Sequence, residues 1–186
     1  MKKNPNRCAY VNMGNPLYIR YHDEEWGVPE HSDQKLFEML LLECFQAGLS
    51  WECVLNKREA FRTAFDHFDA DKIACYGEEK IQQLMNNPAI IRNRLKIKAS
   101  ITNAIVFKQI QAEYDSFDAY IWGYTNGETI IEEYTVRTTS PLSDRISKDL
   151  KKRGMKFVGS TIIYSYLQAI GILNAHGKEC DWYKHD

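Results

Sequence analysis

The chain has 186 residues, which is enough for one domain with a sizeable core or for two small lobes. Its apolar share of 44% and its charged share of 26% are ordinary for a soluble globular protein. No apolar run reaches the roughly 18 residues that a membrane span needs, so no membrane contact is expected. The net charge of −1 disfavours a non-specific polyanion binder but leaves room for a local basic face.

The N-terminus and the cysteines indicate a reducing compartment. The opening residues MKKNPNRCAY carry charge but no apolar stretch, so no secretory signal is predicted. The cysteines, at positions 8, 44, 53, 75 and 180, are odd in number and argue against a disulfide framework. We therefore expect a cytoplasmic protein in which Cys44, Cys53 and Cys75, which fall within or beside helical patterns, are small core residues.

Apolar residues at helical spacing follow one another along most of the chain. Ser32 or Asp33 can cap the first clear helix, and Ser50 can cap the next one. The last helix has Ser160 or Thr161 as its cap and is apolar nearly all round, which predicts that it is buried. The predicted helices cover 32–48, 51–65, a short segment after Asp69, 78–85, a long segment within 86–114, 142–153 and 159–173.

The segment 116–140 is less regular, and WGYTNGE within it is typical of a turn between short pieces. No stretch alternates convincingly between apolar and polar residues, so no strand is predicted. The sequence therefore favours an all-α fold.

Basic residues gather in two segments, RNRLKIK (92–98) and KDLKKRGMK (148–156). Taken alone, each segment is more simply explained as a solvated helix face. Two such clusters in one small chain favour nucleic-acid binding only modestly.

Candidate metal ligands lie at both ends of the chain. His176 and Cys180 are four residues apart, and the first segment adds Cys8 and His22. Four such donors would fill a tetrahedral zinc site and leave no position for an activated water, so the metal would be structural. The spacing matches no compact zinc finger, and free thiols with ordinary histidines remain the alternative.

Glu43 is a carboxylate in an apolar setting. In EMLLLECFQAGLSW it shares a helix face with Leu36, Leu40 and Ala47, so it points toward the core. Burying an unpaired carboxylate costs several kcal/mol, so Glu43 needs a partner or a purpose. A buried arginine or a helix N-terminus could supply the partner, and a ligand could supply the purpose.

Aromatic residues surround this acid in the sequence. Trp51 opens the helix that follows it, and further rings stand upstream at Tyr10, Tyr18, Tyr21 and Trp26. One acidic acceptor beside several rings suits a flat, electron-poor ligand, above all a cationic one. The simpler alternative is that these rings fill a core.

Several segments, taken together and in order, resemble a known family. They are CAY, PLYIRYHDEEWG, LFEMLLLE, QAGLSW, KKRGMKFVG and HGKEC. They resemble 3-methyladenine DNA glycosylase I, a bacterial branch of the helix-hairpin-helix DNA repair glycosylases. The resemblance runs from about Cys8 to Cys180 and implies one helical domain over 1–186. An alternative division has a hairpin-bearing lobe at about 30–115 and a zinc-bearing lobe made of 1–29 and 116–186.

The resemblance also implies roles for the residues singled out above. It implies a structural zinc on Cys8, His22, His176 and Cys180. Glu43 would accept hydrogen from the adenine N6 amine of an extruded base, and Trp51 would stack on that base. Tyr18 and Tyr21 would line the same pocket. Tyr10 stands where a tryptophan is familiar, which keeps a ring there.

Contacts to DNA are implied at two places. The stretch 46–49, with Gln46, Gly48 and Leu49, would fill the gap left by the extruded base. The hairpin at 84–98, which includes Ala89, Arg92 and Lys96, would grip the phosphate backbone. A glycine is expected at position 89, and a positive φ there would strain Ala89.

The implied activity is hydrolysis of the bond between 3-methyladenine and its sugar in double-stranded DNA, which leaves an abasic site. No pocket lysine is evident, so strand cleavage is not expected. Tyr21 or Glu43 could activate the attacking water. The alternatives are a non-catalytic, zinc-stabilised DNA-binding module and a metal-dependent hydrolase, and the second needs an open coordination position. A bacterial, cytoplasmic monomer is expected.

Overall fold

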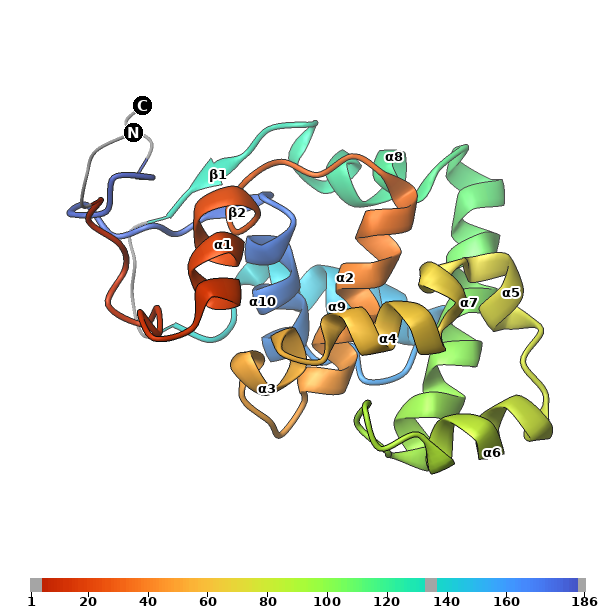
Figure 1. The fold of residues 1–186 in the computed structure, drawn as a ribbon. Coiled ribbons are helices and arrows are strands. Elements are labelled where there is room, and N and C mark those ends of the chain that lie inside the picture. Colours follow the sequence, from red (N-terminus) through yellow and green to blue (C-terminus); the bar gives the residue numbers. More distant parts are fainter. Residues whose placement is uncertain (1–4, 133–136, 184–186) are drawn as a thin grey trace.

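A computed structural model describes residues 5–132 and 137–183; residues 133–136, which fall in the irregular segment 116–140, lie outside it. Figure 1 shows helices packed around a central one, with very little strand. The helices are α1 (Pro16–Glu24), α2 (Asp33–Gln46), α3 (Trp51–Leu55), α4 (Arg58–Ala64), α5 (Ala70–Ala74), α6 (Glu78–Asn86), α7 (Arg94–Tyr114), α8 (Phe117–Trp122), α9 (Pro141–Lys152) and α10 (Ser160–Ala169). The shorter elements are η1 (Asp66–Phe68), η2 (Gly123–Thr125), β1 (Ile130–Ile131) and β2 (Leu173–Asn174).

Helix α2 is the centre of the core. Every residue from Leu36 to Phe45 is buried. The ring of Phe45 lies 4.7 Å from that of Phe61 in α4, and the hydroxyl of Tyr166 in α10 donates a hydrogen bond to the Leu36 carbonyl at 3.1 Å. Because neighbours cover α2 on all sides between Leu36 and Phe45, the polar residues Glu38 and Glu43 in this stretch are buried as well.

Most of the predicted helices are confirmed, including the short α5, α6 and α9. The prediction of one helix over 51–65 is wrong, because this segment forms the two helices α3 and α4. The chain leaves helical geometry at Lys57, where φ is −106° and ψ is 0°, and Asn56 accepts a hydrogen bond from the Asn15 side chain at 2.9 Å. Apolar spacing continued across this break because both α3 and α4 pack on the core.

Helix α10 begins and ends differently from the prediction. Its N-cap is Gly159, so neither Ser160 nor Thr161 caps it. It stops before Gly171, whose φ is +75° and where an added Cβ would lie 2.3 Å from the Val28 carbonyl carbon. Only glycine fits this contact, which seats the end of α10 against the chain between α1 and α2.

The expectation of no strand is wrong in detail. Ile130 pairs with Leu173 and Ile131 with Asn174 in a parallel ladder of two residues each. Strands this short cannot show an alternating pattern, so the sequence could not reveal them. Of the predicted core cysteines, Cys44 is buried, but Cys75 is exposed. Among the described residues, no helix has the length and apolar character that crossing a bilayer requires.

Candidate functional site

A cavity of about 180 Å³, which we call the aromatic pocket, lies between α1, α2, α3 and α10. Helices α1, α2 and α10 each contribute two side chains three residues apart, so both lie on one helix face. The lining residues are Tyr10, Tyr18, Tyr21, Trp26, Glu43, Gln46, Trp51, Ser165 and Gln168. The pocket therefore gathers residues from both ends of the chain into one site.

Glu43 is the acid of the aromatic pocket. It is 3% exposed, and its Oε2 atom has no hydrogen-bond partner in the part of the chain that the structure describes. Burial raises the pKa of Glu43 to about 8, and no basic residue lines the cavity. The arginine partner that the sequence left open is not found among the pocket residues. The carboxyl group is thus available to a polar or cationic ligand.

Aromatic rings form the walls around this acid. Trp51 and Tyr21 have ring centres 5.0 Å apart at an interplanar angle of 46°, and Tyr10 and Trp26 lie edge to face at 5.2 Å. Trp51 is placed at the start of α3 by the Ser50 cap, as predicted from the sequence. These rings offer a stacking platform for a flat ligand.

Tyr21 is held in its neutral form. Burial, followed by the charge of Glu43, raises its pKa well above the ordinary value. A phenol in this state can donate a hydrogen bond at neutral pH but cannot take up a proton. The pKa of Glu43, which burial raises to about 8, lies much closer to neutrality than that of Tyr21.

The structure thus brings Tyr10, Tyr18, Tyr21, Glu43 and Trp51 around one cavity. Ser165 and Gln168 were not predicted as pocket residues, because the sequence of α10 is apolar nearly all round. Their signal was the spacing of three residues between the two polar side chains in the second half of that helix.

The rim loop, residues 46–50, joins α2 to α3 beside the pocket. Gln46 lines the cavity, and its side chain donates a hydrogen bond to the Leu49 carbonyl at 3.3 Å. Gly48 has a φ of +80° and an open surrounding, and Leu49 is 41% exposed. The loop therefore presents an apolar side chain to solvent next to the pocket.

Lys96, predicted as a DNA contact, is buried in the structure. It is only 6% exposed, and its ammonium group donates hydrogen bonds to the carbonyls of Phe45 at 2.8 Å and Ala47 at 2.6 Å. A cation on these carbonyls caps the C-terminus of α2. Lys96 therefore holds the start of the rim loop, and it does not belong to an exposed basic surface.

The hairpin, residues 87–93, connects α6 to α7. Ala89 and Arg92 are exposed. Ala89 is not among the residues with positive φ, so alanine is not strained there. The Ala89 carbonyl instead accepts a hydrogen bond from the Lys57 ammonium at 3.2 Å, and Asn93 caps α7.

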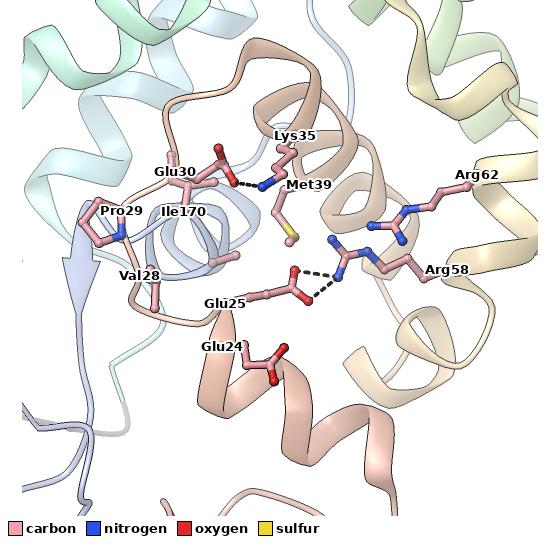
Figure 2. Close-up of a pocket in the computed structure, with 11 residues that line it drawn as sticks. Glu24, Glu25, Val28, Pro29, Glu30, Lys35, Met39, Arg58, Arg62 and Ile170 are labelled. Atoms are coloured by element: carbon pink, nitrogen blue, oxygen red, sulfur yellow. Dashed lines mark hydrogen bonds and ion pairs between the residues drawn. The ribbon is translucent and has the colours of Figure 1, made fainter. Parts of the chain in front are cut away.

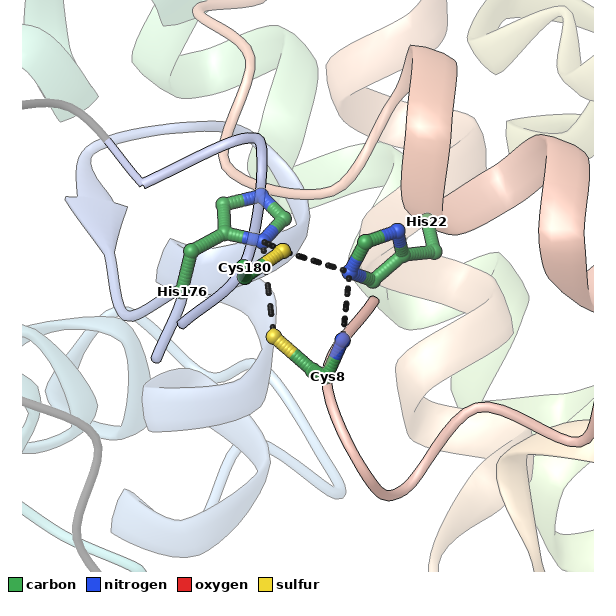
Figure 3. A group of neighbouring side chains, drawn as sticks. All are labelled: Cys8, His22, His176 and Cys180. Atoms are coloured by element: carbon green, nitrogen blue, oxygen red, sulfur yellow. Dashed lines mark hydrogen bonds between the residues drawn. The ribbon is translucent and has the colours of Figure 1, made fainter. Parts of the chain in front are cut away.

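A second cluster lies near the chain ends, and we call it the metal-ligand cluster (Figure 3). Its members are the buried residues Cys8, His22, His176 and Cys180, whose ligand atoms all lie within 4.8 Å of one another. Cys8 Sγ is 3.6 Å and Cys180 Sγ is 3.4 Å from His176 Nδ1, and Cys180 Sγ is 3.6 Å from His22 Nε2. Donor atoms from two chain ends thus converge on one point, which can hold a metal ion.

Neighbouring groups orient both histidines of this cluster. His22 Nδ1 lies 2.8 Å from an Asp23 carboxylate oxygen, and His176 Nε2 lies 3.1 Å from the Trp26 carbonyl oxygen. Asp23 is in turn held by Arg7 through a hydrogen bond of 2.8 Å. Such contacts fix which ring nitrogen faces the cluster centre.

A larger cavity of about 480 Å³ lies beside the C-terminal end of α1 (Figure 2). Its charged side chains are largely paired: Arg58 binds Glu25 at 2.7 Å and Glu38 at 2.5 Å, and Lys35 binds Glu30 at 3.1 Å. No aromatic ring lines it. It therefore lacks the stacking surface that the aromatic pocket offers.

The fold and the aromatic pocket together define a helical protein with a ring-lined cavity of a shape and chemistry that can hold a flat, polar ring. Comparison with known proteins agrees with that class. Residues 11–184 match the family model described as methyladenine glycosylase. The chain therefore belongs to the methyladenine glycosylase family.

Named relatives cover nearly the whole chain. It is 46% identical to DNA-3-methyladenine glycosylase 1 of Escherichia coli, over 95% of this chain and 96% of that protein. It is 40% identical to DNA-3-methyladenine glycosylase of Haemophilus influenzae, over 94% of this chain and 96% of that protein. A crystal structure of 3-methyladenine DNA glycosylase I matches with a TM-score of 0.92 and 45% identity, covering 96% of this chain and 100% of that one. A structure of 3-methyladenine DNA glycosylase I from Staphylococcus aureus, solved to explain 3-methyladenine recognition, matches with a TM-score of 0.92 and 36% identity. The match covers 97% of this chain and 98% of that one.

Proposed function

We propose that this protein extrudes 3-methyladenine from alkylated double-stranded DNA and hydrolyses its bond to the sugar. The observation that carries the proposal is Glu43, a buried acid without a partner, inside a ring-lined cavity in a chain of the methyladenine glycosylase family. A nucleobase in a duplex is stacked, so the enzyme must extrude the nucleotide at a cost of a few kcal/mol.

Recognition of the extruded base follows from the pocket. Methylation at N3 gives adenine a positive charge in DNA, and a cation is drawn to both rings and a carboxylate. Trp51 offers the stacking face, while Glu43 accepts hydrogen from the N6 amine. Because the pKa of Glu43 is about 8, a cationic base also favours the ionised carboxylate and releases its proton.

The chemistry demands little acid catalysis. The charged base leaves as a neutral molecule, so water attacks the anomeric carbon of an oxocarbenium-like sugar. Tyr21 stays protonated and therefore serves as a wall and a hydrogen-bond donor; of the two groups considered for activating water, Glu43 is the better suited. No lysine lines the pocket, which supports a monofunctional enzyme without strand cleavage.

We propose zinc as the metal of the metal-ligand cluster. Tetrahedral zinc with bonds of about 2.3 Å to sulfur and 2.0 Å to nitrogen separates S and N donors by roughly 3.5 Å. The observed S–N distances of 3.4–3.6 Å fit this geometry, and two cysteines with two histidines are a zinc donor set. Bound there, zinc would hold the two ends of the chain together, and four protein ligands leave no place for a reacting water.

The DNA surface is proposed to combine the rim loop and the hairpin. The hairpin with α6 and α7 suits a helix-hairpin-helix, because the amides of Ile90, Ile91 and Arg92 carry no hydrogen bond within the described chain and can meet a phosphate. Arg92 adds an exposed cation. Lys96 is left out of this surface because its ammonium is occupied inside the protein.

Incubation of the protein with methylated duplex DNA, followed by chromatography of the free bases, tests the proposal. We expect release of 3-methyladenine, with strands cut only after alkali treatment. Binding to DNA without base release would favour the non-catalytic, zinc-stabilised module. Activity lost on chelation before the fold is lost would favour a metal-dependent hydrolase.

The cellular setting is part of the proposal. Zinc thiolates persist in a reducing compartment, and the named relatives come from bacteria, whose DNA lies in the cytoplasm. We propose that the protein acts there as a monomer, because extrusion of one nucleotide needs one pocket.

A further inference from the structure

Phe157 combines two properties that are uncommon for an aromatic residue. Its side chain is 37% exposed, and its φ of +57° lies in the left-handed region. A bulky side chain is strained at such a φ, whereas glycine is not. Strain of this kind persists only where the surroundings enforce it, and it concentrates at functional sites.

Buried groups on both sides enforce the conformation. Asn103 of α7 is fully buried; its Oδ1 accepts a hydrogen bond from the Lys156 amide at 2.8 Å and its Nδ2 donates one to the Lys156 carbonyl at 3.0 Å. On the other side, Val158 is 1% exposed, and its carbonyl accepts a hydrogen bond from Ser147 at 2.7 Å. With both neighbours fixed, the ring of Phe157 has to face outward.

The ring lies beside the rim loop. Lys96 Nζ is 5.8 Å from the centre of the Phe157 ring, and the same atom binds the Phe45 and Ala47 carbonyls at the end of α2. Figure 1 shows the α9–α10 loop between that end of α2 and the hairpin after α6. Phe157 and the exposed Leu49 are therefore two apolar side chains on the proposed DNA surface, and Lys156 adds an exposed cation.

We infer that Phe157 inserts into the duplex next to the extruded nucleotide and stacks on a neighbouring base, an inference that rests on the proposed function. Proteins that unstack DNA use apolar wedges for this purpose. A ring on a rigid, clamped backbone suits the task, because little conformational freedom is lost on insertion.

Two variants test the insertion. In both Phe157→Ala and Phe157→Gly, we expect affinity for duplex DNA with an abasic-site analogue to fall about tenfold or more, because a stacking ring is lost. Affinity for free 3-methyladenine, measured by calorimetry, should stay within about twofold, since the ring does not line the pocket. Phe157→Gly should melt at a higher temperature than Phe157→Ala, because glycine adopts a positive φ without strain.

The comparison of the two variants separates stacking from folding. If the loss in Phe157→Ala reflected a damaged fold, the less strained Phe157→Gly would regain affinity. Tyr114→Ala is the matched control: that ring is 39% exposed at the far end of α7, about 27 Å from Lys96 along the helix, and DNA affinity should not change.

Wild-type affinity in both Phe157 variants would overturn the inference, even while the wild-type protein releases 3-methyladenine. Failure of the wild-type protein to release 3-methyladenine would instead contradict the proposed function. The abasic-duplex measurement would still decide whether Phe157 contacts DNA.

Discussion

The metal-ligand cluster and the aromatic pocket both bury polar atoms, but they treat them in opposite ways. In the cluster, each histidine is oriented by a neighbour, and the donor atoms face one another. In the pocket, Glu43 Oε2 and Trp51 Nε1 are buried without a partner among the described residues. An unsatisfied buried group costs about 1–3 kcal/mol, which a ligand can recover. We therefore propose that the cluster serves stability and that the pocket serves recognition.

The largest effect should come from breaking the metal-ligand cluster. Structural zinc binds with an apparent free energy of about 10–16 kcal/mol in small peptides, so losing one ligand should cost several kcal/mol. We expect Cys180→Ala to lower the melting temperature by on the order of 10 °C, measured by circular dichroism. Cys75→Ala, at an exposed thiol, is the control and should melt like the wild type. Equal melting of all three proteins would contradict a structural metal.

The next largest effect should separate two buried carboxylates on α2. Glu43→Gln should slow base excision about a hundredfold, because it removes the charge proposed to meet the cationic base, and should not lower the stability at neutral pH. Glu38→Gln should instead lower stability and leave the excision rate of the folded protein unchanged, because Glu38 is paired with Arg58 and Arg62. Breaking such a buried pair costs about 3–5 kcal/mol. Excision rates on methylated DNA and urea unfolding measure the two effects, and similar behaviour of both variants would refute the contrast.

The two sites also differ in how far the sequence could predict them. The metal ligands could be proposed from chemistry alone, because few cysteine–histidine sets exist in the chain, and the resemblance implied the same four. Glu43 stood out because an acid interrupts an apolar helix face. Ser165 and Gln168 could not be found in this way, because their helix meets α1 and α2 only in the folded chain.

The fold shows the same limit. Helix positions follow from apolar spacing, but the break at Lys57 and the β1–β2 pairing depend on contacts distant in sequence. Lys96 was predicted to contact DNA because the family resemblance implies a phosphate-binding hairpin at 84–98. Its actual partners, the carbonyls of Phe45 and Ala47, lie some fifty residues earlier, so local sequence gave no sign of them.

A pH effect on stability should follow from the raised pKa of Glu43. Its pKa rises from about 4.5 in the unfolded chain to about 8 in the folded one. The folded state therefore binds the Glu43 proton more tightly than the unfolded state does. The stabilisation that this proton gives is fully present below pH 4.5 and is lost as the pH rises to about 8. The wild type should lose about 1.4 kcal/mol per pH unit in this window relative to Glu43→Gln. Urea unfolding of both proteins at pH 6 and pH 8 checks this, and parallel curves would contradict it.

Lys96 shares a property with each of the two sites. Its ammonium group is paired inside the protein, as in the cluster, but it also holds the rim loop beside the pocket. We expect Lys96→Met to weaken binding to abasic-analogue DNA about tenfold, because the rim loop loses its cap. The dependence of affinity on salt should not change, whereas Arg92→Ala should lower that slope by about 0.9 for each lost phosphate contact. Fluorescence titrations at several salt concentrations measure both slopes. A reduced slope in Lys96→Met would show that Lys96 contacts phosphate after all.

The smallest expected effect compares two serines. Ser165 lines the aromatic pocket, whereas Ser143 is fully buried and bound to Ser140 and Ser160. A neutral hydrogen bond contributes about 1 kcal/mol net, so Ser165→Ala should weaken 3-methyladenine binding only severalfold and leave melting unchanged. Ser143→Ala should lower the melting temperature and leave binding unchanged, because Ser143 forms the capping box of α9 with Ser140 and does not line the pocket. Calorimetry and thermal melting distinguish them; if Ser165→Ala changed only the melting temperature, α10 would frame the pocket without contacting the base.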